Sequence, residues 1–339
     1  MRLLKRVLLV ILSVICVIVV GILAFAATPL SACKFPDIAS DVSSVGEGEA
    51  GENTASRLVT DHVRYTEASD HTQIAYRNYS PANPKAVVIF YHGSGANSGA
   101  GYQPVGIGLS EKYGIATYLP DIRGHGLSGG ERGDAPSLQQ IYDDVTLMIG
   151  TAHNEFPSLP VFLGGHSAGA GLIVNYINSP GHEFVNGYLF VAPDFGLKSN
   201  TIYEDNGHFA TVCQKAYIAH ALTFGLLKGH AIGVKYNYSE EQMESDIGLV
   251  QYNSVIMSLA LNPGKPSEEV ARIDRPFGLW VGAGDEVMDP NKVVKFADLA
   301  KQVRDESTAQ IVPGEKHLTI LEDTASLIGP WVQKFLAEK

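Results

Sequence analysis

Short, continuous apolar segments recur along the chain from about residue 86 and alternate with stretches of helical periodicity. Such segments are typical of strands that are buried on both faces of a parallel sheet. The six segments are 86–91, 115–120, 161–164, 187–192, 277–281 and 309–312. Helical periodicity marks 137–154, 168–178, 291–303 and 318–336. Two alternating segments between Val63 and Tyr79 predict an antiparallel pair ahead of them. The pattern therefore predicts an α/β fold with a mostly parallel, eight-stranded sheet and helices on both faces.

One long stretch interrupts this alternation. Residues 196–275 separate two predicted sheet strands and have mainly helical character, most clearly over 217–233 and 245–261. Open α/β sheets bind ligands at the carboxyl ends of their strands. We therefore interpret 196–275 as an inserted helical cap over that edge.

The N-terminus carries a different pattern. Residues 7–27 form a run of 21 residues without a charge, preceded by Arg2, Lys5 and Arg6. At about 1.5 Å per residue, a helix of this length covers about 30 Å, the hydrocarbon thickness of a bilayer. Because basic residues stay on the cytoplasmic side, we expect a single-pass anchor with everything after Ala27 on the extracytoplasmic side.

Two other interpretations of this segment remain open. Ala24-Phe25-Ala26 has the form of a signal-peptidase site, although the apolar run is longer than a usual signal peptide. Leu30-Ser31-Ala32-Cys33 resembles a bacterial lipobox, which would make the protein a lipoprotein through Cys33. We divide the chain into an anchor or signal segment (1–33), a flexible linker (34–57) rich in small and acidic residues, and one folded domain (58–339).

Charge and cysteine content narrow the possible partners. The 36 acidic and 25 basic residues give a formal net charge of -11, which argues against a nucleic-acid partner. Three cysteines are too few for a disulfide framework or a zinc site, so we interpret Cys213 as a small buried residue and expect no metal or cofactor. The expected partners are a small-molecule or lipid ester substrate and a membrane.

The pattern Gly-x-Ser-x-Gly occurs at Gly165-His166-Ser167-Ala168-Gly169, between a predicted strand and a predicted helix. This is the setting of a nucleophile elbow, in which a strained turn exposes the serine hydroxyl above the sheet. The residues two positions away must be small so that the backbone can pass closely. We predict that Ser167 is a nucleophile.

A serine hydroxyl needs a base, and the base needs a carboxylate that orients it. Asp285 follows the strand 277–281, and His317 lies in the loop after the last strand, at the same predicted sheet edge as Ser167. His317 is the only histidine downstream of Asp285. We predict these roles for Asp285 and His317; the rival acids, ranked lower, are Glu286, Asp289 and Asp323.

An oxyanion hole requires two backbone donors. The N–H groups of Ala168 and Ser94 are the candidates, because Ala168 follows the nucleophile and Ser94 follows the first buried strand. A second interpretation is that Gly93, Gly95 and Gly99, with Asp121 after the next strand, form a dinucleotide-binding turn of an oxidoreductase. Under this second interpretation, the expected arrangement of Ser167, Asp285 and His317 would be a coincidence.

The motifs together resemble the monoacylglycerol lipase and lysophospholipase group of α/β-hydrolases, which is grouped with serine aminopeptidase-like hydrolases. The resemblance covers about residues 72–334 and is most specific over 121–129 and 159–167. It implies an α/β-hydrolase fold with a cap between strands six and seven, and the same roles for Ser167, Asp285, His317, Ser94 and Ala168. The chain departs from the group at two places. Ala96-Asn97-Ser98 stands where the group usually has an acidic residue and a histidine, and Ala168-Gly169-Ala170 follows the serine where the group commonly has Met-Gly-Gly.

We expect a membrane-tethered serine hydrolase that cleaves carboxylic esters, with monoacylglycerols or lysophospholipids as the leading substrates. A serine peptidase or amidase would use the same three residues. A cofactor-free haloperoxidase and a non-catalytic binding protein of the same fold are the remaining alternatives.

Overall fold

The central feature of the fold is an eight-stranded sheet in the order β1-β2-β4-β3-β5-β6-β10-β11. The computed structural model describes residues 2–28, 61–203, 209–245 and 247–337. All strands run parallel except β2, which is antiparallel to β1 and β4. The strands are β1 (Val63–Glu67), β2 (Gln73–Tyr79), β3 (Val87–Tyr91), β4 (Ala116–Pro120), β5 (Val161–His166), β6 (Gly187–Val191), β10 (Phe277–Gly282) and β11 (Thr308–Val312).

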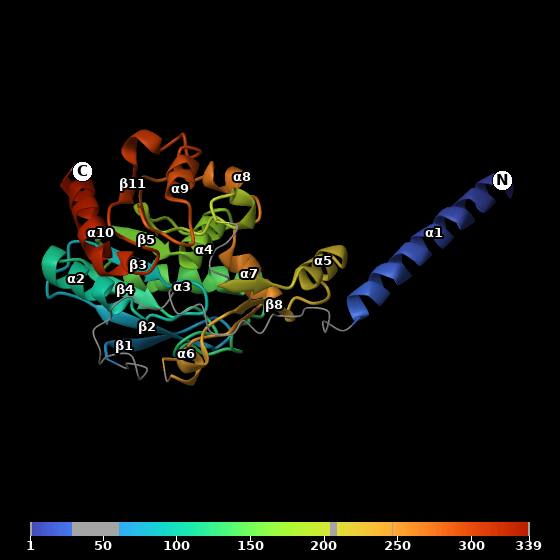
Figure 1. Ribbon diagram of the computed structural model, residues 1–339, viewed down its shortest axis with the longest axis horizontal. Helices are drawn as coiled ribbons and strands as arrows, with labels where there is room; N and C mark the ends of the chain where they lie inside the picture. The colour runs from blue at the N-terminus through green and yellow to red at the C-terminus, as the bar shows by residue number, and fades with distance from the viewer. Residues whose placement is uncertain (1, 29–60, 204–208, 246, 338–339) are drawn as a thin grey trace.

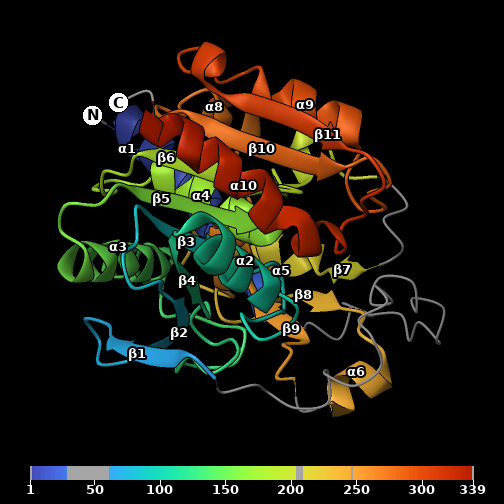
Figure 2. The same ribbon diagram turned by 90° about the vertical axis from the view of Figure 1, so that its left-hand side faces the viewer.

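Helices cover both faces of this sheet (Figures 1 and 2). Side chains alternate along β3, so Ile89 joins one apolar cluster and Phe90 joins the other. The first cluster packs under α3 (Leu138–Glu155), α4 (Ala168–Ile177) and α9 (Pro290–Ala297), and the second under α2 (Gln103–Tyr113) and α10 (Ile320–Ala337). Burial on two faces explains why the strands are continuously apolar, and the expected sheet is confirmed.

The segment between β6 and β10 contains a second, three-stranded antiparallel sheet, β7-β8-β9, as well as helices. Its elements are η3 (Leu197–Ser199), β7 (Ala210–Val212), α5 (Gln214–Leu222), β8 (Ile232–Tyr236), α6 (Glu240–Glu244), β9 (Tyr252–Ser254), α7 (Val255–Leu261) and α8 (Pro266–Val270). Apolar periodicity did not predict this sheet. The helix expected over 217–233 ends at Leu222, because Phe224 and Gly225 both have positive φ and turn the chain.

Another expected helix, 291–303, is also shorter in the structure. Helix α9 begins after Asp289, whose side chain accepts hydrogen bonds from the N–H groups of Asn291 and Lys292, and it ends at Ala297. A separate turn, η4 (Arg304–Glu306), precedes β11.

Helix α1 (Arg2–Ala27) projects away from the body of the molecule (Figure 1). Its segment Lys5–Ala27 has a mean hydropathy of 3.4 over the most apolar window, none of which is buried. This helix is long and apolar enough to cross a membrane, and a signal sequence would have the same properties. The expected linker, 34–57, and Cys33 lie outside the described residues.

Cys213 corrects one expectation. It is buried, as predicted, but it is disulfide-bonded rather than a simple small core residue. Cys16, within α1, is free. A count of three cysteines excludes a framework of several bridges but not a single bridge, and distance along the chain does not decide which cysteines meet in space.

Candidate active site

Ser167 occupies the turn between β5 and α4, at the carboxyl end of the sheet. Its backbone has φ 53° and ψ -122°, a conformation that residues other than glycine rarely adopt. The Ser167 N–H donates to the Val191 carbonyl at 3.0 Å, which ties the turn to β6. The strained turn leaves the serine partly exposed and places it at the N-terminus of α4.

The two glycines of the pattern are required by close backbone contacts. A Cβ atom added to Gly165 would lie 2.5 Å from the carbonyl carbon of Gly169, and one added to Gly169 would lie 2.5 Å from the His92 carbonyl oxygen. Real Cβ atoms essentially never approach other atoms so closely. The Gly-x-Ser-x-Gly spacing is therefore a packing requirement of this turn.

His317 lies between Ser167 and Asp285. Its Nε2 atom is 3.1 Å from the Ser167 hydroxyl oxygen, and its Nδ1–H donates to Asp285 Oδ2 at 2.9 Å. The other oxygen of Asp285 accepts the N–H groups of Val287 and Met288 at 2.9 and 2.7 Å. The structure thus brings together all three residues that the sequence placed at one sheet edge.

The two buried groups of this pair shift each other's acidity. Burial lowers the pKa of His317, but the negative charge of Asp285 and the hydrogen bond to it outweigh burial, so the net pKa is raised above 6.5. Burial likewise raises the pKa of Asp285, yet the His317 charge and the hydrogen bonds lower it overall below 3.8. Asp285 is therefore ionised at neutral pH, and its carboxylate fixes the imidazole with its proton on Nδ1.

Behind His317, a chain of hydrogen bonds joins the histidine loop to the loop after β3. His166 Nε2–H donates to the His317 carbonyl at 2.9 Å, and its Nδ1 accepts from the Tyr102 hydroxyl at 2.9 Å. The same hydroxyl accepts the Gly93 N–H at 2.7 Å. Burial lowers the pKa of His166 to about 3, so this ring stays neutral.

The rival acids have other contacts. Glu286 accepts the backbone N–H of His317 at 3.1 Å, Asp289 caps α9, and Asp323 is exposed in the first turn of α10. None of these carboxylates is hydrogen-bonded to the His317 ring in the described part of the chain. Sequence reasoning missed Asp194, which follows β6 at the same edge. Burial raises the pKa of Asp194, and its charge lies close enough to His317 to affect that ring.

The two predicted oxyanion donors belong to backbone segments next to the serine. Ala168 is the first residue of α4, and Ser94 follows Gly93, where an added Cβ would lie 3.2 Å from the Ser167 Cβ. Among the described residues, neither the Ser94 nor the Ala168 N–H donates to a protein acceptor. Both remain available to an oxygen bound above Ser167.

Side chains in the sequence motifs near the site form hydrogen bonds that fix the backbone of its loops. His92 donates to the Gly93 carbonyl and accepts the Ile122 N–H, and burial lowers its pKa to about 4. Asp121 accepts the N–H groups of Ser98 and Leu127. Since its carboxylate is already bound to two loops, Asp121 is not placed to bind a ribose, as the dinucleotide interpretation requires.

The insertion between β6 and β10 contacts the predicted oxyanion loop directly. The Tyr238 hydroxyl donates to the Ser94 carbonyl at 2.8 Å, and the Val250 N–H donates to the Gly95 carbonyl at 2.8 Å. Asn97 donates to the Ile247 carbonyl at 2.7 Å. No sequence signal predicted these contacts, because they join residues about 150 positions apart.

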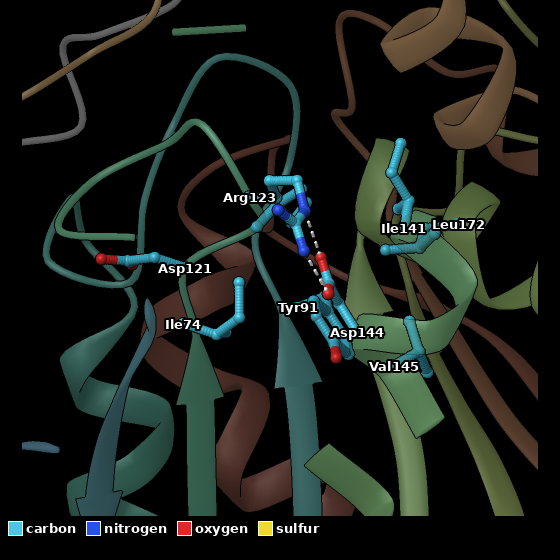
Figure 3. A pocket seen from close by; sticks show the side chains of 9 residues that line it. Ile74, Tyr91, Asp121, Arg123, Ile141, Asp144, Val145 and Leu172 are labelled. Carbon is cyan, nitrogen blue, oxygen red and sulfur yellow. Dashed lines mark hydrogen bonds and ion pairs between the residues drawn. The ribbon is translucent and has the colours of Figure 1, made fainter. Parts of the chain in front are cut away.

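A small cavity lies beside a buried ion pair between Arg123 and Asp144 (Figure 3). Tyr91 lines this cavity, and its buried hydroxyl has no hydrogen-bond partner in the described part of the chain. None of Ser167, Asp285 and His317 lines the cavity. It belongs to the structural core beneath the loops and is separate from the Ser167 site.

The profile of the family described as serine aminopeptidase S33 matches residues 82–324, which is most of the chain. The chain belongs to this family. The α/β-hydrolase resemblance and the expectation of a hydrolase are thereby confirmed. Within the family match lie all the predicted site residues, from Ser94 to His317.

Several relatives match the chain over different shares of its length. Human monoglyceride lipase is 31% identical over 265 residues, which cover 74% of this chain and 81% of that protein. A monoacylglycerol lipase of Mycolicibacterium smegmatis is 32% identical over 108 residues, covering 31% of this chain and 37% of that protein. An uncharacterised abhydrolase domain-containing protein of Dictyostelium discoideum matches over only 12% of its own length.

Solved structures share the fold at lower identity. A carboxyl esterase of Bacillus coagulans superposes with a TM-score of 0.62 at 15% identity, covering 81% of this chain and 98% of that chain. A soluble variant of the Saccharomyces cerevisiae monoglyceride lipase superposes with a TM-score of 0.59 at 17% identity, covering 84% and 97%. These structures confirm the α/β-hydrolase fold.

Proposed function

We propose that this S33-family chain is a serine hydrolase that cleaves carboxylic esters through an acyl-enzyme on Ser167. The observation that carries the proposal is the continuous contact from Asp285 through His317 to the Ser167 hydroxyl, with distances of 2.9 and 3.1 Å. This is the geometry that general-base activation of a serine requires.

In the first half-reaction, His317 Nε2 takes the Ser167 proton while the serine oxygen forms a bond to the ester carbonyl carbon. The carbonyl oxygen becomes an oxyanion, which the N–H groups of Ser94 and Ala168 stabilise. His317 then gives its proton to the leaving alcohol as the ester C–O bond breaks. Water repeats these steps on the acyl-enzyme and releases the carboxylic acid.

Lipid-type esters are the leading substrate class. Human monoglyceride lipase aligns with 74% of this chain, and its name states the ester it acts on. The N-terminal helix would place the enzyme at the surface where such esters reside. We therefore propose monoacylglycerols or lysophospholipids as substrates, taken up beneath an insertion at about 196–275 of a domain that spans 58–339.

For the N-terminal segment we propose a single-pass anchor, with the hydrolase domain on the extracytoplasmic side. Arg2, Lys5 and Arg6 precede the apolar run, which favours a cytoplasmic N-terminus. The disulfide bond of Cys213 supports the orientation, because structural disulfides form and persist mainly outside the reducing cytosol.

Replacing Ser167 with Ala tests the proposed function. The full chain in detergent is assayed on p-nitrophenyl esters of increasing chain length and on monoacylglycerol. We expect kcat to fall by a factor of the order of 10⁶ if the three residues act as a unit. The melting temperature of the variant serves as the control for folding, and wild-type activity in a folded Ser167→Ala variant contradicts the proposal.

A peptidase or amidase is the second candidate, because the family to which the chain belongs is described as a serine aminopeptidase. It uses the same acylation chemistry with an amine as the leaving group. An aminoacyl-p-nitroanilide measured beside the esters discriminates between the two: the proposed esterase shows the higher kcat/KM on the ester of the same acyl group.

A further inference from the structure

The insertion exposes a group of apolar side chains around the end of α5 and the turn that leads to β8. We call it the α5 patch; its members are Ile218, Leu222, Phe224, Leu226, Leu227 and Ile232. Phe224 is 94% exposed and Leu226 is 84% exposed. Large apolar side chains gathered on one surface mark a site of interaction with a protein or a membrane.

The backbone of this turn is strained in a way that holds the patch outward. Phe224 and Lys228 have φ 52° and 63°, left-handed values that are unfavourable for residues with side chains. The turn is closed by the Thr223 hydroxyl, which accepts the Leu227 N–H at 3.1 Å, and by a bond from the Gly225 N–H to the His220 carbonyl at 2.9 Å. The strained turn leaves the Phe224 side chain in water, where it packs against almost nothing in the fold. We therefore expect a contact outside the fold to compensate for the strain.

The chain segment that carries the patch differs in charge from the protein as a whole. Residues 209–238 contain Lys215, Lys228 and Lys235 and no Asp or Glu, in a chain whose formal net charge is -11. An apolar surface with flanking lysines matches the chemistry of an anionic phospholipid interface.

The position of α1 relates the patch to a bilayer. The C-terminal end of α1 contacts α5, where the Lys215 ammonium lies 5.7 Å from the centre of the Phe25 ring and Ala26 is buried. Figure 1 shows α5 at the end of the body from which α1 projects. The apolar segment of α1 ends at Ala27, so the proposed anchor would place the membrane boundary at the level of α5.

We infer that the α5 patch rests in the membrane that α1 crosses, with its apolar side chains among the lipid chains and its lysines at the headgroups. This inference rests on the proposed membrane anchoring. The insertion that contacts the Ser94 loop is then the part of the hydrolase that touches the lipid. The predicted oxyanion loop is thus linked through Tyr238 to the membrane-facing element.

The test is a Phe224→Trp variant of the full chain in nanodiscs of phosphatidylcholine and phosphatidylglycerol that contain a brominated phosphatidylcholine. Bromine quenches tryptophan only within the bilayer. The matched control is Tyr65→Trp, an aromatic position that is 54% exposed on β1, far from α1. After subtraction of the wild-type signal from Trp280 and Trp331, we expect strong quenching at 224 and none at 65. Equal quenching at the two positions overturns the inference.

A second variant, Phe224→Ser with Leu226→Ser, links the patch to lipid access. We expect its kcat/KM on monoacylglycerol in anionic vesicles to fall at least fivefold, with unchanged hydrolysis of soluble p-nitrophenyl acetate. Equal rates of wild type and variant on vesicles contradict the inference. Alkaline carbonate extraction separates the two proposals: release of wild type contradicts the anchor itself, whereas retention without quenching at 224 contradicts only the patch.

Discussion

The Nδ1 atom of His317 lies 2.9 Å from the Asp285 carboxylate, and this contact sets both the tautomer and the acidity of the proposed base. Asp285→Asn preserves the shape but removes the charge and allows the amide to donate to Nδ1, so that the proton moves to Nε2 and the base is blocked. We expect kcat to fall by a factor of about 10⁴. Steady-state kinetics on a p-nitrophenyl ester measure this. Glu286→Gln is the comparison, because Glu286 is hydrogen-bonded to the His317 backbone N–H and acts on the ring only through its charge, so we expect a much smaller loss.

The raised pKa of His317 makes activity depend on pH in a defined direction. Only the neutral imidazole accepts the serine proton, so kcat/KM rises with pH through the pKa of His317. We expect the midpoint of this acid limb above 6.5, the ordinary value for histidine. In Asp285→Asn the negative charge that raises the pKa is gone, and the residual activity should show a midpoint at lower pH. A midpoint unchanged by the substitution contradicts the assigned electrostatic role of Asp285.

Gly169 is packed against the backbone of the loop after β3. Gly169→Ala places a Cβ 2.5 Å from the His92 carbonyl oxygen, and we expect a loss of about 1–3 kcal/mol in the free energy of unfolding, together with lost activity. Gly150→Ala in α3 is the matched control. No atom lies within 4 Å of its added Cβ, and alanine favours a helix interior by about 1 kcal/mol. Thermal melts compare the two; equal melting temperatures would contradict the packing requirement.

Tyr238 contributes to the site from the insertion, through its 2.8 Å hydrogen bond to the Ser94 carbonyl. Tyr238→Phe removes this bond and loosens the loop that presents the Ser94 N–H. We expect kcat to fall about 2- to 10-fold, the equivalent of one hydrogen bond, with little change in KM for a short ester. Tyr65→Phe, at an exposed position on β1, should leave both constants unchanged.

The disulfide of Cys213 gives a prediction about the N-terminal segment. Cys16 is free, and the sequence contains one other cysteine, Cys33. A disulfide and a thioether lipid cannot share one sulfur atom, so a Cys33→Ala variant tests whether that sulfur carries either of them. In cells, Cys33→Ala should expose a new thiol at Cys213 to a maleimide reagent without prior reduction and leave the protein in the membrane fraction. Loss from the membrane in this variant supports the lipoprotein interpretation instead.

The sequence predicted the main sheet because its strands are buried on both faces, which produces uninterrupted apolar runs such as 187–192. The sequence also predicted that Ser167, Asp285 and His317 lie close together, because the carboxyl ends of parallel strands meet at one edge of the sheet. It did not predict β7, β8 and β9, whose short strands carry no periodic signal, or the Tyr238 contact. Such contacts depend on how the insertion folds back, and no local pattern encodes that path.

The central claim is that Ser167 is the nucleophile. The most direct measurement is reaction of the full chain with a fluorophosphonate, followed by mass spectrometry of the peptide that contains Gly165-His166-Ser167-Ala168-Gly169. The proposed mechanism predicts one phosphonylated residue, Ser167, in wild type and loss of labelling in His317→Ala. A stable adduct on a different serine, or undiminished labelling of a folded Ser167→Ala variant, contradicts it.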